Sequence, residues 1–123
     1  MTTYGLSRNR NSRPIGWIKA ARKVFETFPD AVRDRANTAL TIAAEGGKAD
    51  IAKPLKGVES GVFQIAIRHR TNAWRVVYVA ELAGRLWVIH AFRKKSKVGT
   101  RTPKPEIDLI VGRLARLKRE KLS

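Results

Sequence analysis

The stretch VFQIAIRHRTNAWRVVYVAELAGRLWVIHAF, residues 62–92, sets the architecture of this chain. Three runs within it are rich in β-branched and aromatic residues, as strands are, and only a few residues separate them. These short connections predict an antiparallel meander with strands over 62–69, 74–82 and 85–92. The last two runs are apolar at odd and even positions alike, so we expect other elements to cover both faces of the sheet.

Helical patterns lie on both sides of the meander. Before it, a helix is expected to begin at Pro29–Asp30 and to end at Gly46–Gly47, with its apolar residues recurring on one face. After it, Thr102 is a candidate N-cap and Pro103 suits the first helical position. An apolar stripe over 107–117 then predicts a C-terminal helix.

The remaining segments are less regular. Residues 14–23 fit either a short strand or a helix, and residues 48–61, which contain a proline and several glycines, are expected to form a loop. A helical region, a three-stranded meander and a final helix predict a small α+β domain over residues 14–123. Residues 1–13 are polar and basic, and we expect them to form a flexible arm.

Charge narrows the possible functions. The 123 residues include 26 Lys and Arg against 10 Asp and Glu, a net charge of +16, which is typical of a nucleic-acid-binding protein or of a protein with an acidic partner. A role on a membrane surface would instead favour a basic amphipathic helix with aromatic residues, whereas the aromatic residues here lie mostly in strand-like runs. No signal peptide or membrane span is expected, and a cytoplasmic location is predicted.

The inventory of catalytic motifs is short. Cysteine is absent, which excludes disulfides and thiolate chemistry, and no phosphate-binding glycine loop occurs. With two histidines and scattered acids, neither a metal site nor a cofactor is expected. His90 lies among large apolar residues and is interpreted as a hydrogen-bonded core residue, whereas His69, at a strand end, is a candidate site residue.

Two arginines in the strands are the main catalytic candidates. Arg75 interrupts an apolar strand, where a charge is costly unless it is paired or faces a binding surface. It is either a functional cation or the partner of an acid such as Glu81, and Arg68 lies on the polar face of its own strand. The cations of the basic run that follows the last strand are expected to contact phosphate or an acidic partner: Arg93, Lys94, Lys95, Lys97 and Arg101.

The segments KPLKG, GVFQIAIRH, NAWRVVYVAEL, RLWVIHAFRKKSK and TPKPEIDLI, taken together, resemble the RelE/ParE toxin superfamily, in particular its HigB-like, phage-derived branch. The resemblance covers about residues 13–120, and the basic run followed by Thr-Pro is its most specific part. It implies a compact β-α-α-β-β-β-α fold with a mainly antiparallel sheet, and it favours a strand for the ambiguous segment that contains PIGWI.

The resemblance also implies a function. Many members of the superfamily are ribosome-dependent endoribonucleases that cut mRNA without a metal, and each is neutralised by a cognate antitoxin, often a helix-turn-helix protein that also binds operator DNA. Arg75 matches a catalytic arginine of the superfamily, and Lys94 falls near a cation that contacts the scissile phosphate. Gln64 and Ala66 stand where two catalytic lysines would be expected. Either Arg68, His69, Lys95 or Lys97 is recruited in their place, or the catalysis differs from that of the superfamily.

Three functions therefore remain open. The chain is expected to be the toxin of a toxin–antitoxin pair that acts on mRNA at the ribosome. The alternatives are a toxin of the same superfamily that inhibits DNA gyrase, and a basic nucleic-acid-binding domain without catalysis.

Overall fold

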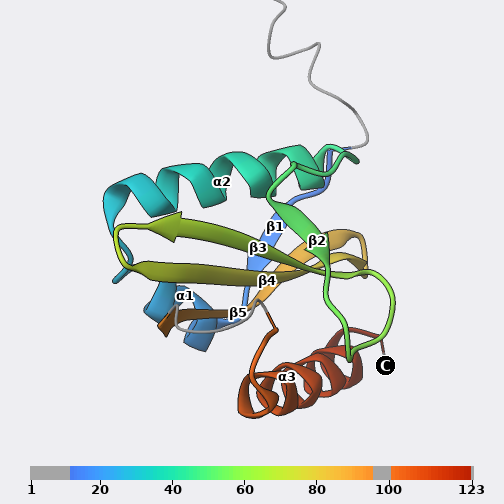
Figure 1. Ribbon diagram of the computed structural model, residues 1–123. Coiled ribbons are helices and arrows are strands. Elements are labelled where there is room, and N and C mark those ends of the chain that lie inside the picture. The colour runs from blue at the N-terminus through green and yellow to red at the C-terminus, as the bar shows by residue number, and fades with distance from the viewer. Residues whose placement is uncertain (1–11, 96–100, 123) are drawn as a thin grey trace, which may run out of the picture.

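The computed structural model describes residues 12–95 and 101–122 and contains one five-stranded sheet with three helices (Figure 1). The elements follow in the order β1 (Ile15–Trp17), α1 (Lys19–Phe25), α2 (Asp30–Ala44), β2 (Ala52–Pro54), β3 (Val62–His69), β4 (Asn72–Leu82), β5 (Arg85–Lys95) and α3 (Lys104–Leu122). The α+β class and the predicted order of helices, meander and C-terminal helix are confirmed. Residues 1–11 of the predicted arm lie outside the described residues, whereas the backbone amide of Arg13 donates to the carbonyl of Ala44 at 2.8 Å.

The strands lie in the order β1-β5-β4-β3-β2. All neighbouring pairs are antiparallel except β1 and β5, which run parallel, so the first strand of the chain completes the sheet beside the last. The ambiguous segment 14–23 thus supplies both a strand and α1. The close packing of β1 on β5 needs a glycine, because a Cβ at Gly16 would lie 2.7 Å from the Trp87 ring.

The prediction that residues 48–61 form only a loop is wrong. Ala52–Pro54 form β2, which pairs with β3 in the register Ala52↔Ile65 and Pro54↔Phe63. Pro54 lies at the end of this strand, on the outer edge of the sheet, where a missing N–H does not interrupt a ladder. Such a short edge strand has no hydrophobic alternation of its own, and its pairing depends on the neighbouring strand.

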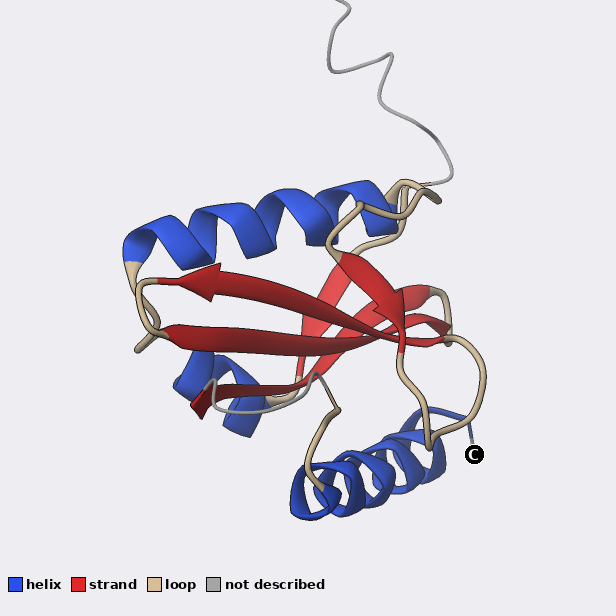
Figure 2. Cartoon of the chain, in the orientation of Figure 1, coloured by secondary structure: helices blue, strands red, loops and turns tan. Residues whose placement is uncertain are grey.

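Helices cover both faces of the sheet, as the apolar strands predicted (Figure 2). Helix α2 lies along one face, where Ala36, Leu40 and Ala43 pack with α1 against strand residues such as Ile65. Helix α3 lies on the opposite face through Ile110, Leu114 and Leu117, which pack against strand residues such as Val77 and Ile89 (Figure 1). The two faces are called here the α2 face and the α3 face.

Strand β4 begins at Asn72 rather than at residue 74, and two further boundaries that differ from those predicted affect the candidate site. Strand β5 continues to Lys95, because the register pairs it with the start of β4 at Asn72↔Lys95. Helix α3 begins at Lys104, so the cap position falls on Pro103, whose carbonyl accepts from the amide of Ile107 at 3.1 Å. The predicted N-cap, Thr102, is one residue too early, and its hydroxyl bonds to β3 instead.

Candidate functional site

The sheet register gathers three cations on the α3 face. Arg75 lies across from Ala66 on β3 and from Phe92 on β5, and Ala73 lies across from both Arg68 and Lys94. Because residues that lie across from each other share a face of the sheet, Arg68, Arg75 and Lys94 all project from the α3 face. These three residues are called here the cationic cluster, and they lie at the end of β4 away from the apolar contacts with α3.

Burial makes the members of the cluster unequal. Arg75 is only 6% exposed, Lys94 is half-buried and Arg68 is exposed. Loss of water lowers the pKa of Arg75, and the nearby charge of Arg68 lowers it further. Loss of water also lowers the pKa of Lys94, with an additional contribution from Arg75. The cluster is thus a set of like charges around a desolvated guanidinium, an arrangement that favours binding of an anion.

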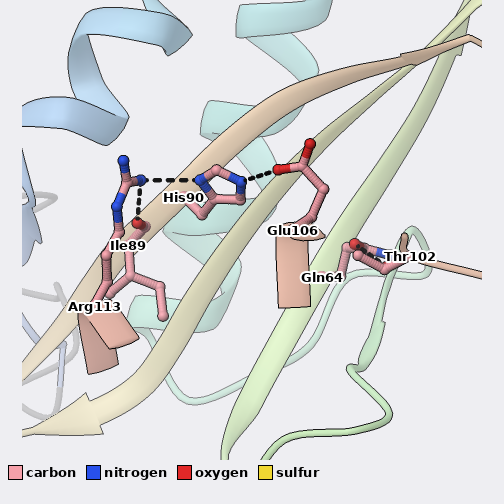
Figure 3. Close-up of polar contacts among 6 residues, drawn as sticks. All are labelled: Gln64, Ile89, His90, Thr102, Glu106 and Arg113. Atoms are coloured by element: carbon pink, nitrogen blue, oxygen red, sulfur yellow. Dashed lines mark hydrogen bonds and ion pairs between the residues drawn. The ribbon is translucent and has the colours of Figure 1, made fainter. Parts of the chain in front are cut away.

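The segment before α3 is tied to the same face. The Lys94 ammonium donates to the backbone carbonyl of Arg101 at 2.9 Å. One residue later, the hydroxyl of buried Thr102 donates to the side-chain oxygen of Gln64 on β3 at 2.8 Å (Figure 3). These two contacts hold the backbone of Arg101 and the side chain of Thr102 against the sheet. The first contact also orients the Lys94 side chain.

A hydrogen-bonded histidine lies between the sheet and α3. His90 Nδ1 lies 2.9 Å from the Arg113 guanidinium and His90 Nε2 lies 2.6 Å from Glu106, while Arg113 also donates to the carbonyl of Ile89 at 3.0 Å (Figure 3). Since arginine only donates, Nδ1 accepts and Nε2 carries the proton that is donated to Glu106. Burial lowers the pKa of His90, so the ring is neutral near pH 7. The interpretation of His90 as a hydrogen-bonded core residue is confirmed.

Two of the other predicted site residues lie away from the cationic cluster. His69 lies across from Asn72, and Arg93 lies across from Trp74, at register positions that belong to the α2 face. Lys95 is also paired with Asn72. Because β5 extends to Lys95, strand alternation places Arg93 and Lys94 on opposite faces of the sheet. Lys97 lies outside the described residues, and Arg101 is exposed.

Sequence reasoning missed four residues that make polar contacts on the α3 face: Gln64 and Thr102 in their observed contact, Glu106 and Arg113. One signal was present for the pair on α3. Glu106 and Arg113 are seven residues apart, two helical turns, and flank the apolar stripe that begins at Ile107. Opposite charges at that spacing beside a buried stripe indicate a polar partner on the surface that the helix covers. The alternative partner proposed for Arg75, Glu81, accepts from the amide of Gly84 in the β4–β5 turn at 2.9 Å.

Two further properties concern the part of the chain that the structure describes. No group of three or more His, Asp or Glu side chains there could hold a metal ion. Within the same residues, no helix has the length and apolar character needed to cross a bilayer.

The mainly antiparallel sheet with helices on both faces defines a small α+β protein with a RelE-like fold. The chain belongs to the family of phage-derived Gp49-like proteins, whose family model matches residues 23–115. The predicted phage-derived branch is thereby confirmed, and the predicted RelE-like fold is confirmed as well.

Two solved structures are similar in fold. A double arginine-to-alanine variant of the E. coli toxin RelE in the free state has a TM-score of 0.59 and 16% sequence identity, and the alignment covers 86% of this chain and 98% of that one. The isolated E. coli RelE toxin in its P21 crystal form has a TM-score of 0.52 and 16% identity, and the alignment covers 83% of this chain and 98% of that one. No curated protein sequence matches this chain.

Proposed function

We propose that this chain is the toxin of a toxin–antitoxin pair and that it cleaves mRNA bound to the ribosome. The observation that carries the proposal is the cationic cluster, in which two further cations lie near an arginine that is 6% exposed. The RelE-like fold supports the same function, since the solved structures of that fold are described as toxins. The proposed partners are a cognate antitoxin, the ribosome and mRNA, and operator DNA would be reached only through the antitoxin complex.

The proposed chemistry uses the nucleophile that RNA already carries. The 2′-oxygen attacks the adjacent phosphorus, a new P–O bond forms, and the bond to the 5′-oxygen of the next nucleotide breaks. The leaving 5′-oxygen takes a proton from water, so the products are a cyclic phosphate and a 5′-hydroxyl. The protein must align the strand, accept the proton of the 2′-hydroxyl, and stabilise the charge that develops on the phosphate oxygens. No cofactor takes part in this scheme.

Each member of the cluster has a proposed role that follows from its burial. Arg75 stabilises the transition state, because a cation in a dry setting interacts with developing charge more strongly than one in water. Lys94, whose pKa is lowered by burial and by Arg75, accepts the proton in its neutral form. Arg68 is exposed and holds a flanking phosphate. His69 lies at a register position of the α2 face and has no role in this scheme.

The test compares Arg75→Ala with Arg93→Ala. Arg93 is the matched control, because it is an arginine of the neighbouring strand at a register position of the opposite face. Arg75→Ala should lower single-turnover cleavage of mRNA on programmed ribosomes by about two to three powers of ten, by analogy with the loss of one oxyanion donor. It should also relieve the arrest of bacterial growth that the parent chain is expected to cause, while Arg93→Ala should change both readouts little.

Folding and the alternative functions are controlled in the same experiment. Arg75→Lys keeps the charge but loses the planar fork, so it should also be impaired, and thermal melts report whether each variant is folded. Parental cleavage by a well-folded Arg75→Ala variant would show that Arg75 has only a structural role. Growth arrest with intact mRNA and broken DNA would instead favour action on gyrase, and normal growth with abundant folded protein would favour a non-catalytic binding domain.

A further inference from the structure

A shallow trough runs along α3 on the side that faces β1 and the start of α1. Its volume is about 750 Å³. Aromatic and aliphatic side chains form most of its apolar lining: Trp17 and Ile18 from the β1–α1 segment, Trp87 from β5, and Leu109 and Leu117 from α3. Leu109 is 44% exposed, so the trough includes apolar surface that the fold itself leaves in contact with water.

Trp87 is held rigidly in this trough. Its indole N–H donates to the carbonyl of Leu82 at 3.0 Å, and its ring packs closely on Gly16, where a Cβ would lie at 2.7 Å. The ammonium of Lys121 lies 5.2 Å from the centre of the same ring. A fixed aromatic side chain is a good anchor for a partner, since little conformational entropy is lost when it is covered.

Gly112 lines the same trough from the α3 side. It lies within the helix, where glycine is less favourable than alanine. Its φ is not in the left-handed region, and a Cβ built there would meet nothing within 4 Å. Neither backbone conformation nor internal packing therefore requires a glycine at this position, whereas close approach of a partner to the helix would.

The charges around the trough favour an acidic partner. Four cations line it, Lys19, Arg113, Arg116 and Lys121, against the two carboxylates of Asp108 and Glu120. Both carboxylates already have partners, since Lys104 binds Asp108 at 2.9 Å and Arg116 binds Glu120 at 3.2 Å. Among residues 12–95 and 101–122, neither Lys19 nor Lys121 makes an ion pair. These two ammonium groups remain available to carboxylates of a partner.

The dimensions of the trough favour a helix. Its α3 lining extends from Leu109 through Gly112 and Arg116 to Glu120, close to the helical repeat. Glu120 lies eleven residues after Leu109, so the helix rises by about 17 Å between them. This rise equals the length of three turns of a second helix. A helix that lies in such a trough places apolar side chains at positions i, i+4 and i+7 against the apolar floor and polar side chains against the rim.

We propose that this trough docks an acidic amphipathic helix of a partner protein, with apolar anchors on Trp87 and Leu109 and carboxylates near Lys19 and Lys121. The proposal is independent of the RNA chemistry proposed above. Trp87 and Lys94 are seven residues apart on β5, which corresponds to roughly 23 Å along a strand. A helix in the trough would therefore leave the cationic cluster open, and the two surfaces can be altered separately.

The test selects ligands for the full-length chain from two displayed libraries of helical peptides of about 18 residues. Both have leucine at i, i+4 and i+7. The first has glutamate at the flanking positions and the second has lysine. Gly112→Gln fills the trough with a long side chain that helices accept better than glycine. Ala115→Gln is the matched control, because Ala115 is exposed on the same helix and is not part of the trough.

Peptides from the glutamate library should be enriched over those from the lysine library. Their affinity should fall by about tenfold or more in Gly112→Gln and by less than about twofold in Ala115→Gln, with Gly112→Gln melting no lower than the parent. Leu109→Gln is the second trough variant and should behave like Gly112→Gln. Enrichment of the lysine library, equal binding by all variants, or displacement by heparin would overturn the proposal. RNA binding, measured on the same samples, should not change in any of these variants.

Discussion

Burial separates the chemistry of two neighbouring cations, Arg75 and Lys94. A guanidinium keeps its proton in proteins even when loss of water lowers its pKa, so Arg75 remains a fixed positive charge. An ammonium begins from a pKa of 10.5, and the same two influences, burial and a neighbouring cation, bring Lys94 closer to the range in which it releases a proton. Adjacent positions on two strands thus favour different roles, one electrostatic and one in proton transfer.

Lys94→Arg tests this division. The change keeps a positive charge. It removes an ammonium whose pKa lies below the ordinary lysine value of 10.5. In the parent, the cleavage rate should rise with pH and level off as Lys94 loses its proton, whereas Lys94→Arg should be slower and should lack that transition. Single-turnover cleavage measured across the alkaline range provides the comparison. Lys104→Arg, on the exposed start of α3, should keep the parental profile, and a transition that persists in Lys94→Arg would assign the base elsewhere.

At the scale of elements, α3 is fixed to β5 by a polar contact as well as by its apolar stripe. A neutral His90 accepts from Arg113 and donates to Glu106, and this pattern fails when the ring gains a second proton, because a protonated ring cannot accept. Protonation would also place two positive groups 2.9 Å apart. The docking of α3 is therefore linked to pH.

The sign of the linkage follows from the pKa of His90, which folding lowers below 6.5. Between the lowered pKa and 6.5 the unfolded chain binds more protons, so the free energy of unfolding should fall as the pH drops through this window. Urea unfolding from about pH 7.5 to about pH 5.5 measures the effect. His90→Gln should reduce this slope, and His69→Gln should retain it. An unchanged slope in His90→Gln would assign the titration to another group.

The sequence allowed the long elements to be predicted because their evidence is local. Strand composition identified β3, β4 and β5, and the apolar face with terminal glycines identified α2. Strand β2 could not be predicted, because three residues at an edge have no periodicity and are held by β3. The end of β5 was misjudged for a related reason. Polar residues resemble a loop, but pairing with Asn72 on β4 extends the strand to Lys95.

The candidate site was predicted by residue type and only partly by position. Arg75 and Arg68 are cations within strands, a pattern visible in the sequence, and Lys94 follows from the basic run. Which of these cations share a face depends on register, and a shift of one residue moves a side chain to the other face. This is why His69 and Arg93 were grouped with residues that the structure places on the opposite face. The contact between Thr102 and Gln64 joins residues 38 positions apart and could not be predicted from local patterns.

At the scale of the whole molecule, a net charge of +16 attracts any polyanion, so affinity alone does not identify the site. The salt dependence of binding does, because each contact between a cation and a phosphate of single-stranded RNA contributes about 0.7 to the slope of log affinity against log salt. Arg68→Gln and Lys94→Gln should each reduce the slope by about that amount, and Arg93→Gln by less. An RNA with a 2′-deoxy scissile nucleotide allows binding to be measured without cleavage, and equal slopes for all three variants would argue against a localised RNA site.

The parallel pairing of β1 with β5 has a consequence for how the protein is made. Ile15 lies across from Leu86, so the first strand to be synthesised is separated from its partner by 71 residues. At cellular rates of translation this interval lasts roughly 4–14 s, and pairings between such distant residues are slow to form. Lys94, the last member of the cationic cluster to be added, lies still further along β5. A ribosome therefore carries an incomplete cluster until synthesis has passed Lys94.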